Sequence, residues 1–290
     1  MFYNIDFSME ESRIGQRNIF LFLLLIIVVQ FIGLVLGIIH SHFGSDFAIY
    51  YTNTRNFWLN QETYQTGFFY LNYFYFLCIW MFLLPEIMGL FIHIILTDLM
   101  FYYIMKSIKN YYELYWFYAN LVLILIHSAT FNTDIWIVFA FLLFLNYRKE
   151  WYAPFFLLLG FFKITPILTF GLLFLILLYY ERKIILKILP SLTGIFLIIL
   201  VSFLTSTGLI SSVAGFWENL IGETGIIVFF QPPHFIWWSI PLMVLIKYKE
   251  INNKLAKKIW FFYACIILLY GLLILILSSS VISNYILTNS

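Results

Sequence analysis

The sequence predicts an all-α integral membrane protein, a single domain over residues 1–290 with about nine transmembrane helices and one interfacial or re-entrant outer segment. Two observations lead to this prediction. Apolar residues make up 63% of the chain and charged residues 10%, whereas soluble domains contain roughly 25% charged residues. Apolar runs such as 19–39 and 259–278 also reach the roughly 20 residues that cross a hydrocarbon core, and Lys or Arg flanks most of them.

Basic residues predict the orientation of these helices. Placing five clusters of Lys and Arg on the cytoplasmic face leaves only Arg55 and Lys163 elsewhere. The clusters are Arg13 with Arg17, Lys106 with Lys109, Arg148 with Lys149, Arg182 with Lys183 and Lys187, and the five lysines of residues 247–258. This bias predicts a cytoplasmic N-terminus and a C-terminus outside.

Residues 42–84 are predicted to form a long outer loop that contains interfacial helices. The apolar stretch 68–84 and the next run, 86–105, cannot both cross the membrane if the basic clusters before and after them face the same side. Pro85 divides the two stretches and suits the first turn of a helix, so the run after it is expected to cross. Residues 207–233 form the second predicted outer loop.

The segment between Arg148 and Arg182 predicts a hairpin that does not reach the outer surface. It holds about 30 apolar residues, whereas two full helical spans need roughly 40. The bend at 162–166 is therefore expected to lie below the surface, as is Asp134 at the outer end of the short run 135–147. Charge and irregular backbone at this depth are tolerated only beside a protein-lined or water-filled cavity. We therefore expect a recessed cavity that opens outward.

Ionisable and polar side chains from four parts of the chain face this expected cavity. Such groups cost several kcal/mol inside a membrane unless they are paired or used, so their convergence favours a functional site. These residues are Asp46, Glu62, Asp134, Lys163, Glu218, Glu223, Gln231 and His234.

Four of these positions also have a purely structural interpretation. Asp46 precedes an amphipathic stretch and suits a helix cap, and Asp134 with Asn132 suits the cap of the next helix. Lys163 is long enough to extend to the membrane surface or to pair with Asp134. His234 follows two prolines and precedes two tryptophans, which is typical of an aromatic belt at the start of a helix.

The remaining polar residues of the apolar runs favour packing roles. Helix-to-helix hydrogen bonds are expected for His93, Asp98 and His127. Cys78 and Cys265 are expected to pack as small buried apolar residues. No H-E-x-x-H spacing and no Gly-rich phosphate loop occurs, so we expect no cofactor and no nucleotide substrate, and a divalent metal is not required although the acidic residues leave room for one. A net charge of +2 predicts no nucleic-acid partner.

Three motifs occur in a fixed order on the predicted outer face. Asp46 follows the first apolar run and precedes Tyr50 and Tyr51 in a Tyr-rich loop; Asn132 lies in the middle; a K-x-[TY]-P pattern begins at Lys163. Together they resemble the motifs of GT-C glycosyltransferases over a little under half the chain. The nearest patterns are those of the polyprenol-phosphate-mannose-dependent mannosyltransferases of glycosyltransferase family 87 and of the GPI mannosyltransferase I catalytic subunit.

This resemblance implies a GT-C-like fold and an inverting transfer of a hexose, expected to be mannose, from a polyprenyl or dolichyl phosphate carrier to a lipid-linked or glycan hydroxyl on the outer or lumenal face. It implies Asp46 as the catalytic base and Lys163 as the cation that binds the donor phosphate. Substrate binding is expected to involve Tyr50, Tyr51, Asn132, Asp134, Glu218, Glu223 and His234. The host membrane would be a prokaryotic plasma membrane or the endoplasmic reticulum. A transporter or lipid flippase, and a non-catalytic scaffold subunit, are the alternatives.

Overall fold

A computed structural model describes residues 16–39, 45–59, 71–163, 166–205 and 234–289. These parts of the chain are helical and contain no β-strand. The helices are α1 (Gln16–Ile39), α2 (Ser45–Trp58), α3 (Tyr73–Leu77), α4 (Trp80–Leu83), α5 (Glu86–Ser107), α6 (Tyr111–Ala119), α7 (Leu121–Thr130), α8 (Asp134–Tyr147), the 3-10 helix η1 (Ala153–Leu159), α9 (Pro166–Tyr180), α10 (Arg182–Thr205), α13 (Phe235–Trp238), α14 (Ile240–Tyr248) and α15 (Asn253–Asn289). The all-α prediction is confirmed for the described residues.

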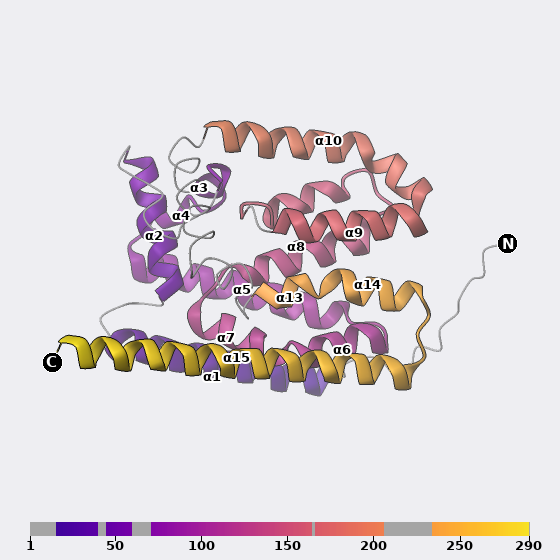
Figure 1. Ribbon diagram of the computed structural model, residues 1–290. Coiled ribbons are helices and arrows are strands. Elements are labelled where there is room, and N and C mark those ends of the chain that lie inside the picture. The colour runs from indigo at the N-terminus through magenta and orange to yellow at the C-terminus, as the bar shows by residue number, and fades with distance from the viewer. Residues whose placement is uncertain (1–15, 40–44, 60–70, 164–165, 206–233, 290) are drawn as a thin grey trace.

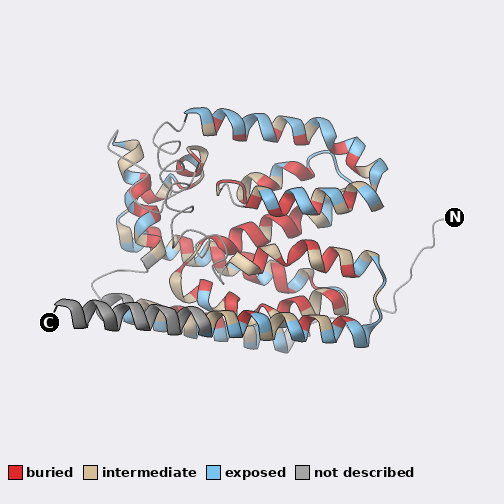
Figure 2. Ribbon diagram, viewed as in Figure 1, coloured by how far each residue is buried: buried red, intermediate tan, exposed pale blue. Residues whose placement is uncertain are grey.

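Within the described residues, four helices are long and apolar enough to cross a membrane. Their apolar spans are Asn18–Leu36, Glu86–Ser107, Arg182–Thr205 and Asn253–Leu272. Many exposed positions of α10 after Lys187 are apolar, for example Leu197 and Val201, and Figure 2 shows exposed residues along much of this helix. Large exposed apolar surfaces on a helix mark contact with lipid or protein rather than water. The described part of the chain therefore has the character of a membrane protein.

Shorter apolar helices lie between these spans: Leu121–Thr130, Asp134–Tyr147, Pro166–Tyr180 and Phe235–Tyr248. At ~1.5 Å per residue, a helix of this length does not cover a hydrocarbon core of ~30 Å by itself. The total of about nine crossings therefore remains a prediction from the sequence.

Figure 1 shows the long helices running along one common direction, with α2 lying across that direction at one end. We call this the α2 end. The opposite end, the basic end, contains residues 106–109, 148–149, 182–187 and 247–258, so the fold gathers four of the predicted basic clusters. The remaining cluster begins outside the described residues. The helix α15 starts at the basic end and finishes at the α2 end. Which end faces the cytoplasm remains a prediction.

Two short helices, α3 and α4, occupy the stretch before Pro85 that was expected to be interfacial or re-entrant. With 5 and 4 residues, neither is long enough to cross a membrane. The backbone N–H of Leu71 donates to the carbonyl oxygen of Phe162 at 2.8 Å. This hydrogen bond ties the outer segment to the turn that carries Lys163.

The two arms of the hairpin between Arg148 and Arg182 are different kinds of helix. The first arm is the 3-10 helix η1, whereas the second is the regular helix α9. Pro154 lies in the first turn of η1, and Gly160 at its C-cap packs so closely that a Cβ atom there would lie 3.2 Å from the Cβ of Ala140 in α8. The 3-10 helix η1 thus packs tightly against α8 at Gly160.

A close approach of α1 and α7 holds the α2 end of α7 in place. A Cβ atom at Gly33 of α1 would lie 2.2 Å from the carbonyl oxygen of Ala129 in α7. Glycine at this position lets the two backbones approach, which is common between membrane helices. The contact fixes the last turn of α7, directly before the turn that carries Asn132.

Candidate functional site

Polar side chains from separate elements meet at the α2 end. Asp46 lies in the first turn of α2, Asn132 lies in the turn between α7 and α8, and Asp134 is the first residue of α8. Lys163 lies in the bend before α9, and His234 directly precedes α13. Hydrogen bonds and ion pairs connect these residues. We call these five residues the polar cluster.

Asn132 connects the members of the polar cluster. Its Nδ2 donates to Asp46 Oδ2 at 2.7 Å, while its Oδ1 accepts from Lys163 Nζ at 3.3 Å and from the backbone N–H of Asp134 at 2.9 Å. The amide can satisfy a carboxylate and two donors only in this orientation. Asn132 therefore fixes the Asp46 carboxylate relative to the Lys163 ammonium group, and it also caps the start of α8.

Asp134 and Lys163 form an ion pair inside the protein. Lys163 Nζ donates to Asp134 Oδ1, and the Asp134 side chain is completely buried while that of Lys163 is 13% exposed. The structure thus contains the Lys163–Asp134 pair that the sequence offered as a structural role for Lys163. Burying two charges costs free energy that their attraction often does not repay. The pair is therefore weak evidence for stability and leaves a functional use open.

Two histidines approach the second oxygen of the same carboxylate. His127 Nε2 lies 3.7 Å and His234 Nδ1 lies 3.6 Å from Asp134 Oδ2, which accepts no hydrogen bond in the described part of the protein. Since His127 sits on the apolar helix α7, the sequence favoured a packing role, and it gave no signal for this contact. The structure adds His127 to the surroundings of Asp134.

The α7–α8 turn holds Asn132 through an unusual backbone conformation. Phe131 has φ 55° and ψ 39°, in the left-handed region that bulky residues rarely adopt. His93 of α5 is fully buried, and its Nε2 lies 3.0 Å from the carbonyl oxygen of Phe131. The His93 ring also stacks on Trp136 of α8, with 5.6 Å between ring centroids. These contacts stabilise the turn, so the expected helix-to-helix role of His93 extends to positioning Asn132.

The two tyrosines of α2 differ in their contacts. The Tyr50 hydroxyl lies 3.5 Å from the backbone N–H of Thr133, next to the polar cluster. The Tyr51 hydroxyl instead donates to the carbonyl oxygen of Leu84 at 3.0 Å and accepts from Arg55 at 2.9 Å. Tyr50 is thus near the candidate site, whereas Tyr51 fastens α2 to the end of α4.

Other predicted site residues lie outside the described parts of the chain, namely Glu62, Glu218, Glu223 and Gln231. Within the described parts, no group of three or more His, Cys, Asp or Glu side chains is arranged to hold a metal ion. What the geometry offers chemically is a partly buried carboxylate, Asp46, joined through one amide to a buried ammonium group, Lys163.

The apolar surroundings of this site are aromatic. Phe162, next to Lys163, packs against Phe74 and Trp136 at centroid distances of 5.1 and 6.3 Å, and Tyr50 packs against Phe74 at 6.1 Å. These rings give the site a wall suited to an apolar chain or a sugar face. Compared with known proteins, the chain shows no match to any family model, curated protein or solved structure.

Proposed function

We propose that this protein is a membrane glycosyltransferase. In this proposal it moves a hexose, with mannose expected, from a polyprenyl or dolichyl phosphate carrier to a hydroxyl of a lipid-linked or glycan acceptor, with inversion at the anomeric carbon. The observation that supports it most directly is the Asn132 bridge between Asp46 and Lys163. It holds a proton acceptor and a cation at a fixed separation, as a displacement that moves negative charge onto a phosphate requires.

Asp46 is the proposed general base. It lies in the first turn of α2, where a carboxylate is stabilised by the helix dipole, and it is only partly buried. In the proposed step it takes the proton of the acceptor hydroxyl while the acceptor oxygen attacks the anomeric carbon. General-base catalysis of this kind contributes roughly 100- to 10,000-fold in rate.

Lys163 is the proposed partner of the donor phosphate. As the bond between the anomeric carbon and the phosphate oxygen breaks, its electron pair leaves with the phosphate, which remains on the lipid. Because Asp46 becomes neutral in the same step, the total charge in the site does not change. The Lys163 Nζ hydrogen bond to the uncharged amide oxygen of Asn132 is long, at 3.3 Å. A charged phosphate oxygen is a stronger acceptor for the ammonium group and can replace this contact.

The aromatic wall formed by Phe74, Trp136 and Phe162 supports a lipid-borne donor. A carrier of this kind reaches the site from the membrane and needs no nucleotide, which fits the sequence without a Gly-rich phosphate loop. His234 and Asp134, which lie within the same cluster, would orient the sugar or the acceptor.

The test is transfer of radiolabelled mannose from a synthetic polyprenyl phosphate donor into membrane lipids. Wild type, Asp46→Asn and Lys163→Met are compared at matched expression, with Asp98→Asn as the control. Asp98 offers a matched carboxylate because it accepts a hydrogen bond from Gln30 between α5 and α1, at 2.8 Å. We expect Asp46→Asn to lose roughly 100-fold or more of the activity and Asp98→Asn to keep most of it.

Two outcomes contradict the proposal. Equal transfer by wild type and Asp46→Asn would show that the carboxylate is not the base. No transfer by folded wild type from mannosyl or glucosyl carriers would favour a scaffold subunit, or a transporter or flippase. Flipping of a fluorescent polyprenyl phosphate in proteoliposomes separates these two alternatives.

A further inference from the structure

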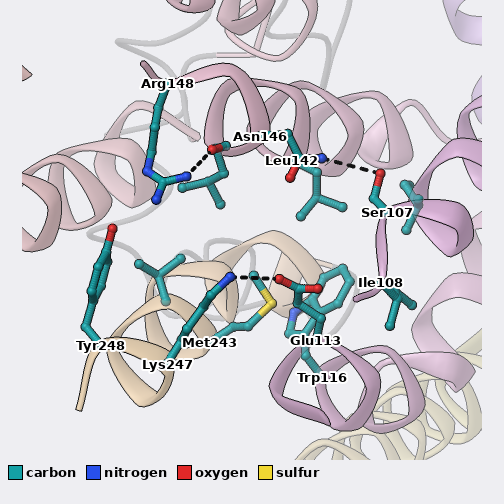
Figure 3. A pocket seen from close by; sticks show the side chains of 13 residues that line it. Ser107, Ile108, Glu113, Trp116, Leu142, Asn146, Arg148, Met243, Lys247 and Tyr248 are labelled. Atoms are coloured by element: carbon teal, nitrogen blue, oxygen red, sulfur yellow. Dashed lines mark hydrogen bonds and ion pairs between the residues drawn. The ribbon is translucent and has the colours of Figure 1, made fainter. Parts of the chain in front are cut away.

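A cavity of about 70 Å³ lies at the basic end, opposite the polar cluster (Figure 3). Arg148 at the end of α8 and Lys247 and Tyr248 of α14 lie on opposite sides of it, and Glu113 of α6 lies beside Lys247. The apolar part of the lining, which we call the floor, includes Ile104, Ile108, Leu142, Leu145, Met243 and Val244. The charged lining residues Arg148, Lys247 and Glu113 are called the rim.

The two cations of the rim are paired, but not equally firmly. Arg148 donates to both oxygens of Glu181, at 2.5 and 2.7 Å. Lys247 Nζ lies 3.1 Å from Glu113 Oε1, and the Lys247 side chain is 47% exposed. An exposed ion pair of this type contributes about 0 to 1 kcal/mol. A ligand anion can therefore compete with Glu113 for Lys247.

Exposed aromatic residues at the basic end indicate the depth of the cavity in the membrane. Trp and Tyr concentrate where a protein meets the lipid headgroups. The exposed Trp and Tyr residues at this end include Tyr102, Tyr147, Trp151, Tyr152 and Tyr179. The cavity rim, which includes residues directly adjoining Tyr147, therefore lies at the level of the headgroups.

Basic residues around the rim favour an anionic ligand. Exposed lysines close to the cavity in sequence include Lys106, Lys149 and Lys249. Each Lys or Arg near a membrane surface contributes about 1 kcal/mol of attraction to anionic lipid. Zwitterionic lipids lack this net attraction, so charge distinguishes the two lipid classes.

We propose that this cavity binds the headgroup of an anionic phospholipid. The phosphate lies between Arg148 and Lys247, and the first carbons of the lipid contact the apolar floor. This site is separate from the polar cluster, and the proposal does not depend on the glycosyltransferase function.

The test measures lipid binding to the purified full-length protein in detergent by native mass spectrometry. Phosphatidylglycerol, phosphatidylcholine and inorganic phosphate are added in separate titrations. Lys247→Gln is expected to weaken phosphatidylglycerol binding about fivefold, and Glu113→Gln, which removes the competing carboxylate, to strengthen it by a similar factor. The control is Lys257→Gln, the same loss of charge at an exposed position of α15, for which we expect less than about a twofold change.

Opposite effects of Lys247→Gln and Glu113→Gln would support the site, because misfolding cannot strengthen binding. Equal weakening by Lys247→Gln and Lys257→Gln would overturn it in favour of a general surface attraction. Unchanged binding in Glu113→Gln would overturn the placement of the phosphate at Lys247, because Glu113 would then not compete with the ligand. Inorganic phosphate that binds as tightly as phosphatidylglycerol would overturn the lipid assignment, as would equal binding of phosphatidylcholine.

Discussion

The two ends of the bundle both contain ion pairs, but water reaches them to different degrees. At the α2 end, the Asp134 side chain is completely buried and Lys163 is 13% exposed. At the basic end, Arg148 is 26% exposed and its partner Glu181 is 15% exposed, and Lys247 is more exposed still. The same types of side chain therefore meet very different costs of desolvation.

This difference indicates what each end contributes to the protein. A partly exposed pair costs less to form than a fully buried one and adds little, so the pairs at the basic end can join helix ends at low cost. Replacing a buried pair such as the one at the α2 end by apolar residues is often neutral, so its net contribution to stability is expected to be small. The pair lies beside Asp46 and Asn132, where the proposed function would use it.

The largest effect is expected for Lys163→Met, which leaves Asp134 buried without its cation. Removing one partner of a buried pair costs about 3–5 kcal/mol of the free energy of unfolding. The measurement is a denaturant titration in mild detergent.

The double variant Lys163→Met with Asp134→Asn is the control for this loss. It contains neither charge, so we expect it to regain most of the stability but none of the proposed transfer activity. If Lys163→Met alone were as stable as wild type, water would reach Asp134 in the variant. The ion pairs at the two ends would then not differ in their desolvation cost.

A smaller effect is expected for Asn132→Leu. The substitution removes the amide that joins Asp46, Lys163 and the first backbone N–H of α8. These groups are partly or fully buried, and leaving them without partners costs about 1–3 kcal/mol of the free energy of unfolding.

Asn146→Leu at the basic end is the matched comparison. Asn146 is exposed, and its contacts with Tyr103 and Ser107 are long, at 3.3 and 3.4 Å. We expect a change within about 0.5 kcal/mol in the same titration. A larger loss for Asn146→Leu than for Asn132→Leu would reverse the comparison between the two ends.

Much of the fold follows from the sequence, since the length of an apolar run determines whether it can span a membrane. The expected crossings 19–39, 86–105 and 259–278 fall within α1, α5 and α15. The 3-10 arm was not predictable, because the contact of Gly160 with Ala140 depends on how η1 packs against α8.

The candidate site could be predicted only in outline. The expected depth of Asp134 and Lys163 follows from the shortness of the surrounding apolar runs, and the structure brings both together with Asp46. The contact of His127 with Asp134 was not predictable, because α7 is mostly apolar and the sequence does not show which neighbouring helix its polar residues meet. The left-handed turn at Phe131 likewise depends on tertiary contacts, among them the one with His93.

An intermediate effect of about 1 kcal/mol on the free energy of unfolding is expected for Arg148→Gln at the basic end. Its bidentate contact with Glu181 places it at the upper end of the range for exposed pairs. The measurement is again a denaturant titration, in a double-mutant cycle of Arg148→Gln and Glu181→Gln. A loss as large as that of Lys163→Met would show that exposure does not separate the two pairs.

The smallest effect is a dependence of stability on pH at the basic end. Burial by itself would raise the pKa of Glu181, but its hydrogen bonds with Arg148 and Tyr248 hold the pKa below its ordinary value. Because the folded pKa is the lower one, the stabilisation is fully present above the unfolded pKa of about 4.3 and is lost as the pH falls through the folded pKa. The Tm of wild type, measured between about pH 6 and pH 3, should therefore fall more steeply below about pH 4.3 than that of Glu181→Gln. Parallel curves would mean that Arg148 does not lower the pKa of Glu181 in the folded protein. The Arg148–Glu181 pair would then not stabilise the basic end.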